Sequence, residues 1–132
     1  MMSSDPIADL LTRLRNGGMA KHSVVRVPSS RVKRSLVDIL QKAGFVGEVR
    51  TEAADHGEVL IVALKYDEEQ RSLIKQVRRV SKPGRRVYIP ASRIPRVKNG
   101  QGMCVLSTSR GMLTDDQARG LGVGGEFICE VW

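Results

Sequence analysis

Aromatic residues are scarce in this chain of 132 residues. They make up 4% of it, so aliphatic side chains must fill most of the core. Cysteine is also scarce, and both Cys104 and Cys129 lie in apolar stretches typical of strands, which indicates free, buried thiols in a reducing compartment. The two histidines are distant from them in the sequence, so the ligand spacing of a zinc site is missing. We therefore expect neither a metal nor a cofactor.

Long apolar runs are missing as well. No stretch reaches the length of a membrane span, and the N-terminus lacks the apolar centre of a signal peptide. We therefore expect a cytoplasmic protein with no membrane partner. The content of 41% hydrophobic and 27% charged residues is that of an ordinary globular protein, and the length suits one domain or two small ones.

Acidic residues are absent from one long segment. Residues 70–114 contain eleven lysines and arginines but no aspartate or glutamate, whereas residues 1–69 contain ten residues of each sign. The whole formal net charge of +8 therefore belongs to the second half of the chain. Such a segment concentrates a positive field and favours phosphate backbones as partners. The alternative is a soluble basic surface with no dedicated partner.

Two helices are expected in the first half of the chain. The first should start at Asp5-Pro6, where aspartate can cap free N–H groups, and should stop at Gly17-Gly18. The second should run from about residue 31 to residue 43, behind the capping pair Ser29-Ser30, and should end at Gly44.

Three strands complete this half and predict an α+β fold. Strands are expected at 24–27, 45–51 and 58–64, the last two joined as a hairpin by residues 52–57. We place a subdomain boundary where the charge changes sign, giving an N-terminal α/β subdomain, 1–68, and a β-rich subdomain, 69–132. The expected architecture is two small packed subdomains, with helices on one side of a small sheet in the first.

The second half predicts mostly strands with short helices. Residues 74–80 and 85–90 should form a hairpin around the turn Lys82-Pro83-Gly84. Residues 114–117 have the pattern of a capping box, so a short helix should start there. The last strand, 126–132, should lie inside the sheet and not form a tail.

The segment 102–111 carries the most specific chemistry. A short apolar strand ends there in three residues with small hydroxyls: Ser107, Thr108 and Ser109. Each hydroxyl can donate and accept hydrogen bonds. Arg110 adds a fixed positive charge, and Gly111 allows a tight turn. Because no general base accompanies the hydroxyls in the sequence, the segment indicates a surface that binds a polar, negative partner and not a nucleophile.

Two further features suggest nucleic-acid contacts. Arg86 and Tyr88 should share one face of a strand, where the arginine can bind phosphate and the ring can stack on a base or ribose; the alternative is a half-buried tyrosine. Residues 120–125 match the pattern G-x-G-x-x-G but follow a helix and precede a strand, which is the wrong context for a dinucleotide site. There, Gly124 and Gly125 indicate either a close backbone approach to a ligand or a flexible turn.

Basic residues at the start of the second helix allow two interpretations. Arg31, Lys33 and Arg34 lie in its first turns, where the helix dipole disfavours cations. The arrangement makes sense if the helix start meets an anion, although a solvated face alone is also consistent with it.

Several spaced motifs resemble the eighth-protein family of the bacterial small ribosomal subunit. The similarity runs from end to end of the chain and rests on the segments 5–16, 28–30, 79–84, 102–111, 112–119 and 124–129. The resemblance implies an α+β protein of two packed subdomains that binds the central domain of small-subunit rRNA directly and helps its assembly. It also implies neighbouring small-subunit ribosomal proteins as partners and, in some bacteria, repression of the protein's own operon message.

The resemblance also implies a set of RNA-binding residues. Carried over to matching positions, they are Tyr88, Ser107, Thr108, Ser109, Gly124, Gly125 and Glu126, with contributions near Asp5 and Arg31. Glu126 is unusual because phosphate repels a carboxylate, so we expect it to accept a hydrogen bond from a base or ribose. Arg86, Arg110 and Gly111 complete the candidate site from the residue patterns given above.

Two other classes of function fit the sequence less well. An enzyme would need a base or metal cluster at usable spacing, which the sequence lacks, so we predict that the chain is not an enzyme. A general basic module with no particular target would share the charge but would not need the hydroxyl segment or Glu126.

Overall fold

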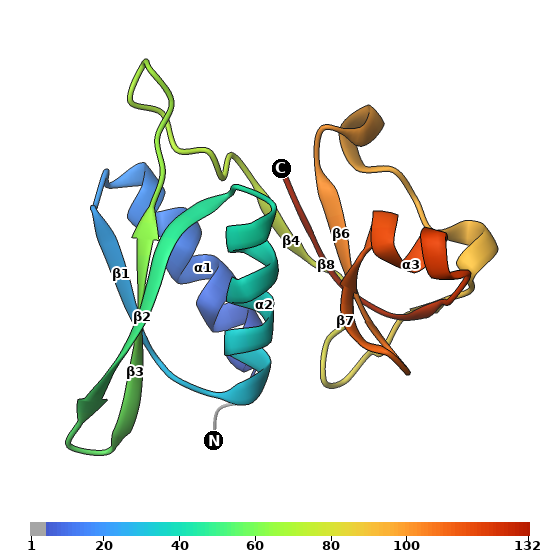
Figure 1. Cartoon of the computed structure of the whole chain (residues 1–132), viewed down its shortest axis with the longest axis horizontal. Coiled ribbons are helices and arrows are strands. Elements are labelled where there is room, and N and C mark those ends of the chain that lie inside the picture. The colour runs from blue at the N-terminus through green and yellow to red at the C-terminus, as the bar shows by residue number, and fades with distance from the viewer. Residues whose placement is uncertain (1–4) are drawn as a thin grey trace. The chain divides into compact units, whose positions relative to one another are not determined.

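The computed structural model of the chain describes residues 5–132 (Figure 1). It divides into two compact units: residues 6–75 form the N-terminal unit, and Asp5 together with residues 76–132 forms the C-terminal unit. Residues 1–4 of the predicted first subdomain lie outside the described residues. Both units combine helices with antiparallel strands, so the predicted α+β class is confirmed.

The N-terminal unit has the predicted order of helix, strand, helix, strand, strand. Its elements are α1 (Pro6–Met19), β1 (Val24–Pro28), α2 (Arg31–Lys42), β2 (Val46–Ala54) and β3 (Gly57–Leu64). β3 pairs antiparallel with β1 on one side and with β2 on the other. Both helices cover one face of this sheet (Figure 1). Leu10 and Leu14 of α1 and Leu60 and Val62 of β3 are buried in the core.

α1 continues through two glycines where the sequence predicts its end, and that prediction is wrong. Gly17 and Gly18 are buried inside the helix. A Cβ on Gly17 would lie 2.6 Å from Val25 Cγ2, so glycine lets the helix approach β1 closely. The chain leaves the helix at Lys21, which has a φ of +60°. The N–H of His22 then donates to the Gly17 carbonyl at 2.9 Å and closes the last turn.

The predicted ends of α2 are confirmed. The Ser30 hydroxyl caps the helix by accepting a hydrogen bond from the Lys33 N–H at 3.2 Å. At the other end Gly44 has a φ of +87°, a conformation that glycine adopts without strain. The Phe45 N–H donates to the Leu40 carbonyl at 2.9 Å, which satisfies one of the last helix carbonyls.

The hairpin of β2 and β3 is longer than the sequence predicts. Ala54 pairs with Gly57, so only Asp55 and His56 remain in the turn instead of residues 52–57. Gly57 has a φ of +111°, which permits this tight reversal. The end of β2 consists of polar and small residues, which do not show the apolar alternation that predicts a strand. Its extended structure depends on pairing with β3.

The boundary between the units lies seven residues later than the charge pattern suggests. The sequence places it between residues 68 and 69, whereas the structure places it between 75 and 76. Tyr66 and Ser72 form an antiparallel bridge, and the Tyr66 hydroxyl donates to the His22 carbonyl at 2.6 Å. These bonds hold residues 66–72 in the N-terminal unit. The boundary therefore lies after residue 75, although the stretch without acidic residues already begins at residue 70.

The C-terminal unit is built around its last strand. Its elements are β4 (Val77–Arg79), β5 (Tyr88–Ile89), η1 (Ala91–Arg93), η2 (Val97–Gly100), β6 (Met103–Thr108), β7 (Gly111–Thr114), α3 (Asp115–Leu121) and β8 (Gly125–Val131). β8 pairs with β6 along one edge and with β4 and then β5 along the other, while β6 also pairs with β7. The predicted interior position of the last strand is confirmed.

The hairpin predicted between β4 and β5 is wrong. Both short strands pair with β8: Arg79 lies opposite Cys129, and Tyr88 lies opposite Glu126. The predicted turn is present, because Lys82 and Arg85 exchange backbone hydrogen bonds of 3.0 and 2.9 Å. The two strands do not turn back on each other because the free edge of β8 is long enough to accept them one after the other.

A hydrophobic cluster forms the core of the C-terminal unit. Its buried members are Ile94, Val97, Cys104, Leu106, Ala118 and Phe127. Cys104 and Cys129 are free and buried, as the sequence predicts. Burial raises the pKa of each thiol to about 12, so the reactive thiolate is scarce near neutral pH.

α3 has the predicted capping box. The Thr114 hydroxyl accepts from the Gln117 N–H at 3.2 Å, and the Gln117 side chain accepts from the Thr114 N–H at 3.0 Å. The helix ends at Gly122, whose φ of +67° lets the Val123 N–H donate to the Ala118 carbonyl at 3.0 Å. The middle glycine of the G-x-G-x-x-G pattern therefore ends a helix and does not cradle a phosphate.

Two glycine-to-alanine variants should have opposite effects on stability. We expect Gly17→Ala to lower the free energy of unfolding by about 1–3 kcal/mol, because Val25 is buried and stiff and cannot easily make room. Gly120→Ala, also inside a helix but with nothing within 4 Å of the added Cβ, should leave that free energy unchanged or raise it by up to about 1 kcal/mol. Urea denaturation followed by circular dichroism measures both. Equal stability of Gly17→Ala and the unaltered chain would contradict the packing argument.

Candidate nucleic-acid interface

Three predicted site residues from different strands lie in one row across the C-terminal sheet. Tyr88 on β5 is directly opposite Glu126 on β8, and Glu126 is directly opposite Ser107 on β6. Side chains directly opposite each other in antiparallel strands share one face of the sheet. The fold thus brings together a phenol, a carboxylate and a hydroxyl from distant parts of the sequence, and we call these three residues the polar row.

Tyr88 is the most accessible member of the polar row. The residue is 69% exposed, which excludes the interpretation of a half-buried core tyrosine. A large aromatic surface exposed at this level contributes little to the packing of the unit. It offers a flat apolar face to a ligand, and unpaired nucleotide bases stack on such faces.

Glu126 is held in place by two side chains. Its Oε2 accepts hydrogen bonds from the Ser81 hydroxyl and from Arg86 Nη1, the latter at 2.9 Å. Burial alone would raise the pKa of Glu126, but these hydrogen bonds and the charges of Arg86 and Arg79 lower it below its ordinary value. Glu126 is therefore a carboxylate that is held in place. Both hydrogen bonds go to Oε2, so they leave Oε1 available to accept a further hydrogen bond.

The role of Arg86 differs from the simplest expectation. Arg86 and Tyr88 do share a face, since both meet Glu126. The guanidinium is paired with the carboxylate, which raises the pKa of Arg86, instead of extending alone towards a phosphate. Ser81 was not recognised from the residue pattern as a partner of Glu126, because only the pairing of β8 with its neighbours brings the two residues together.

The segment with three hydroxyls forms the end of β6 and the turn to β7. The Thr108 hydroxyl donates to the Gly111 carbonyl at 2.8 Å and accepts from the Arg110 N–H at 3.0 Å, so it holds the turn together. Gly111 has a φ of +95°, as the predicted tight turn requires. Ser109 and Arg110 are exposed at the tip of the turn, and Ser107 is exposed on the strand. These side chains are accessible, and their contact with a ligand stays a prediction.

Gly124 and Gly125 allow a close backbone approach within the protein itself. A Cβ on Gly124 would lie 2.3 Å from the Ile89 carbonyl oxygen, and one on Gly125 would lie 2.3 Å from the Ser107 carbonyl oxygen. The backbone of β5 and β6 thus occupies the space that a Cβ would need at these two residues, and their contact with a ligand stays a prediction. The two glycines set the spacing of the strands that carry the polar row.

The two predicted residues near helix starts have different surroundings. In the C-terminal unit, Asp5 is paired with Arg79, with 3.1 Å between the carboxylate and Nε. Arg31 belongs to the N-terminal unit, where it is exposed at the first residue of α2. Of its basic neighbours, Lys33 is buried with Nζ donating to the Pro28 carbonyl at 2.9 Å, and Arg34 lies 3.9 Å from Glu58. Of these three cations, Arg31 is therefore the best placed to bind an anion, because it is exposed while Lys33 and Arg34 already have partners in the protein.

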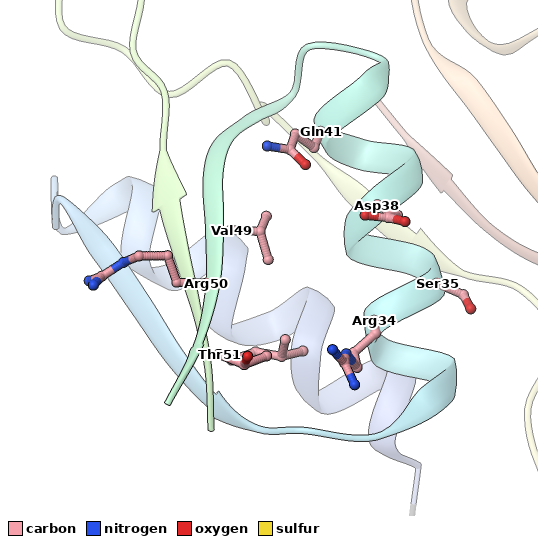
Figure 2. Close-up of a pocket in the computed structure, with 8 residues that line it drawn as sticks. Arg34, Ser35, Asp38, Gln41, Val49, Arg50 and Thr51 are labelled. Carbon is pink, nitrogen blue, oxygen red and sulfur yellow. The ribbon is translucent and has the colours of Figure 1, made fainter. Parts of the chain in front are cut away.

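The N-terminal unit also has a hollow between α2 and β2. Its volume is about 320 Å³ (Figure 2). Arg34 and Gln41 of α2 extend towards β2, while Arg50 extends away from the helix (Figure 2). Asp38 also lines the hollow, so its charges are mixed and do not favour an anion. Arg34, one of the basic residues at the start of α2, lines it, whereas no residue of the polar row does.

Two other kinds of feature are absent from residues 5–132. This part of the chain contains no cluster of three or more histidine, cysteine, aspartate or glutamate residues that could hold a metal ion. Within the same range, no helix is long and apolar enough to cross a membrane.

Comparison with known proteins identifies the family of this chain. A family model described as ribosomal protein S8 matches residues 5–132. The chain belongs to the ribosomal protein S8 family. Proteins named small ribosomal subunit protein uS8 are 52% identical over 132 residues in Geotalea uraniireducens (strain Rf4), 50% over 131 residues in Sorangium cellulosum (strain So ce56) and 48% over 132 residues in Rhodococcus erythropolis (strain PR4 / NBRC 100887). The three matches cover 99–100% of this chain and 100% of each relative.

Membership of the ribosomal protein S8 family confirms the resemblance found in the sequence. The chain is a protein of the small ribosomal subunit, and its family is one of structural ribosomal proteins and not of enzymes.

The environment of Glu126 makes stability depend on pH in a defined direction. Because its pKa is lower in the folded protein, the unfolded chain binds more protons between the two pKa values. The contribution of Glu126 is therefore complete above its ordinary pKa of 4.5 and is lost as the pH falls through the lower folded pKa. In urea denaturation between pH 7 and pH 3, the unaltered chain should lose more stability than Glu126→Gln. Parallel pH profiles of the two proteins would contradict the assignment.

Proposed function

We propose that this ribosomal protein S8 family member binds small-subunit rRNA directly, in the central domain, and helps the subunit to assemble. The observation that carries the proposal is the polar row: Tyr88 is 69% exposed and lies beside the fixed carboxylate of Glu126 and the exposed Ser107. An exposed ring beside polar acceptors on a rigid sheet is suited to reading a nucleotide that is not stacked in a regular duplex.

The polar row matches the groups that RNA presents. The minor groove of A-form RNA is shallow and displays 2′-hydroxyls, and an irregular internal loop adds unstacked bases. Ser107 can exchange hydrogen bonds with either group. Glu126 Oε1 can accept from a base amino group or a ribose hydroxyl, while Arg86 and Ser81 hold the other oxygen. The ring of Tyr88 can stack on a base.

The other predicted residues have supporting roles. Arg110, at the exposed tip of the turn, and Arg31, at the start of α2, would contact phosphates and supply affinity that weakens with salt. Ser109 is exposed at the same tip, whereas Thr108 and Gly111 shape the turn.

The remaining predicted residues act on the shape of the interface. Gly124 and Gly125 set the spacing of the strands, and Asp5 orients Arg79 beside Glu126. Arg86 serves first to fix the carboxylate and second as a positive charge near the backbone of the RNA.

The proposal extends to two further partners. Neighbouring small-subunit ribosomal proteins would contact the surfaces that RNA leaves free. The message of the protein's own operon is a second RNA target if it presents the same irregular loop, because the polar row would bind either RNA. A general basic module is the competing function, and it would not need a fixed carboxylate in a basic region.

Substitution of Tyr88 should weaken RNA binding without weakening the fold. We expect Tyr88→Leu to cost about 1–3 kcal/mol of binding free energy, roughly 5- to 150-fold in affinity, because leucine keeps apolar bulk but cannot stack. The melting temperature should stay unchanged, since the residue is 69% exposed. Filter binding or calorimetry with a central-domain rRNA fragment measures the affinity.

Tyr88→Phe is the matched control because it keeps the ring. It should retain most of the affinity if stacking is the main contribution. Unchanged RNA affinity in Tyr88→Leu, together with a lower melting temperature, would mean that the ring is structural and that the polar row does not bind RNA.

A further inference from the structure

A second hollow lies in the C-terminal unit, outside the polar row. It has a volume of about 230 Å³ and lies in the bend formed by residues 78–87. Its lining is mostly cationic and comprises Arg78, Arg79, Lys82 and Arg85, with Val80 and Val87. No carboxylate lines it, in contrast to the hollow between α2 and β2, which contains Asp38.

Two of the four cations are already paired with carboxylates. Arg78 Nε lies 2.7 Å from Glu130, and Arg79 Nε lies 3.1 Å from Asp5. In residues 5–132, neither Lys82 nor Arg85 is within ion-pair distance of a carboxylate. The hollow therefore carries an excess of two positive charges from these residues, and one phosphodiester carries a single negative charge.

The bend holds in place the backbone from which these two exposed side chains extend. Lys82 and Arg85 exchange backbone hydrogen bonds of 3.0 and 2.9 Å across the Pro83-Gly84 turn. On the N-terminal side of the bend, β4 is anchored to β8, and on the other side the Val87 carbonyl accepts from the Phe127 N–H at 2.8 Å. Because the backbone is already ordered, binding an anion here requires little further loss of backbone freedom, and the cost that remains is the ordering of the two side chains.

The hollow adjoins the residues that hold Glu126. Arg85 lines the hollow, while the next residue, Arg86, donates to Glu126. Arg79 also lines the hollow, and its charge contributes to the lower pKa of Glu126. An RNA strand whose bases meet the polar row would therefore pass with its backbone near the hollow.

We propose that the hollow in the bend of residues 78–87 binds a backbone phosphate of the RNA that the polar row recognises. The inference rests on the proposed function and adds to it a phosphate site with its own residues. Lys82 and Arg85 supply the charge, and Arg78 and Arg79, held by their carboxylate partners, form the walls. The site contributes affinity and register but not base identity.

The first test uses the full chain and inorganic phosphate alone. Labelled with ¹⁵N, the protein is titrated with sodium phosphate at pH 7 against sodium chloride of equal ionic strength. Amide shifts specific to phosphate should concentrate in residues 78–87 and should be lost in the double variant Lys82→Gln/Arg85→Gln. The control Arg93→Gln/Arg96→Gln removes two exposed charges from the same unit and should keep those shifts. Shifts that are absent, or that persist in the Lys82/Arg85 variant, would overturn the site.

The second test asks whether the phosphate comes from RNA. The affinity for the central-domain fragment is measured across a salt series for both double variants. Loss of one phosphate contact should make the log–log slope shallower by about 0.7 to 0.9 in the Lys82/Arg85 variant. Full retention of affinity and slope by that variant would overturn the RNA assignment, even if inorganic phosphate binds.

The two tests separate failure of this inference from failure of the proposed function. If the unaltered chain shows no preference for the central-domain fragment, the proposed function fails and the RNA part of the inference fails with it. If that preference is present but the Lys82/Arg85 variant matches the Arg93/Arg96 control in both tests, the proposed function stands and the phosphate site is refuted.

Discussion

The close packing of backbones at the start of β8 is the constraint on which the candidate interface depends. Gly124 and Gly125 have no side chains, so the backbone of β5 can approach one of them and the backbone of β6 the other. That spacing lets β8 pair with both strands and aligns Tyr88, Glu126 and Ser107 across the sheet. Any side chain larger than hydrogen at either glycine would push apart the strands that carry the polar row. The backbone pairing thus sets the positions of the three residues before a ligand arrives, and such pre-organisation lowers the cost of binding.

Charge and recognition are divided between different residues of this unit. Lysines and arginines supply a positive field that attracts any phosphate backbone, which explains affinity but not selectivity. A carboxylate in such a field is held in place by Ser81 and Arg86, and these partners favour its charged form and lower its pKa. Because Glu126 repels phosphate, a partner must offer it a hydrogen-bond donor, and that requirement is a source of discrimination.

Local signals in the sequence predicted the elements whose ends are determined by their own residues. The cap of α2 at Ser30 and the capping box at Thr114 need no distant partner, and both are present. The glycines of α1 could not be read in this way: a glycine that ends a helix and one that makes room for a neighbouring strand look alike until the position of Val25 is known. The pairing of β4 and β5 with β8, and the contact of Ser81 with Glu126, depend on contacts between residues far apart in sequence, which periodicity does not report.

The most direct test of the central claim is a competition experiment with two RNAs. The full chain is bound to a central-domain fragment of small-subunit rRNA, and a random duplex of equal length competes for it from low to physiological salt. If the polar row reads the RNA, the chain should strongly prefer the fragment, and this preference should persist at physiological salt. The contacts of the polar row are not made to phosphates, so added salt does not weaken them as it weakens phosphate contacts. Equal affinity for the two RNAs, lost for both as the salt concentration rises, would contradict it and reduce the surface to a general basic module.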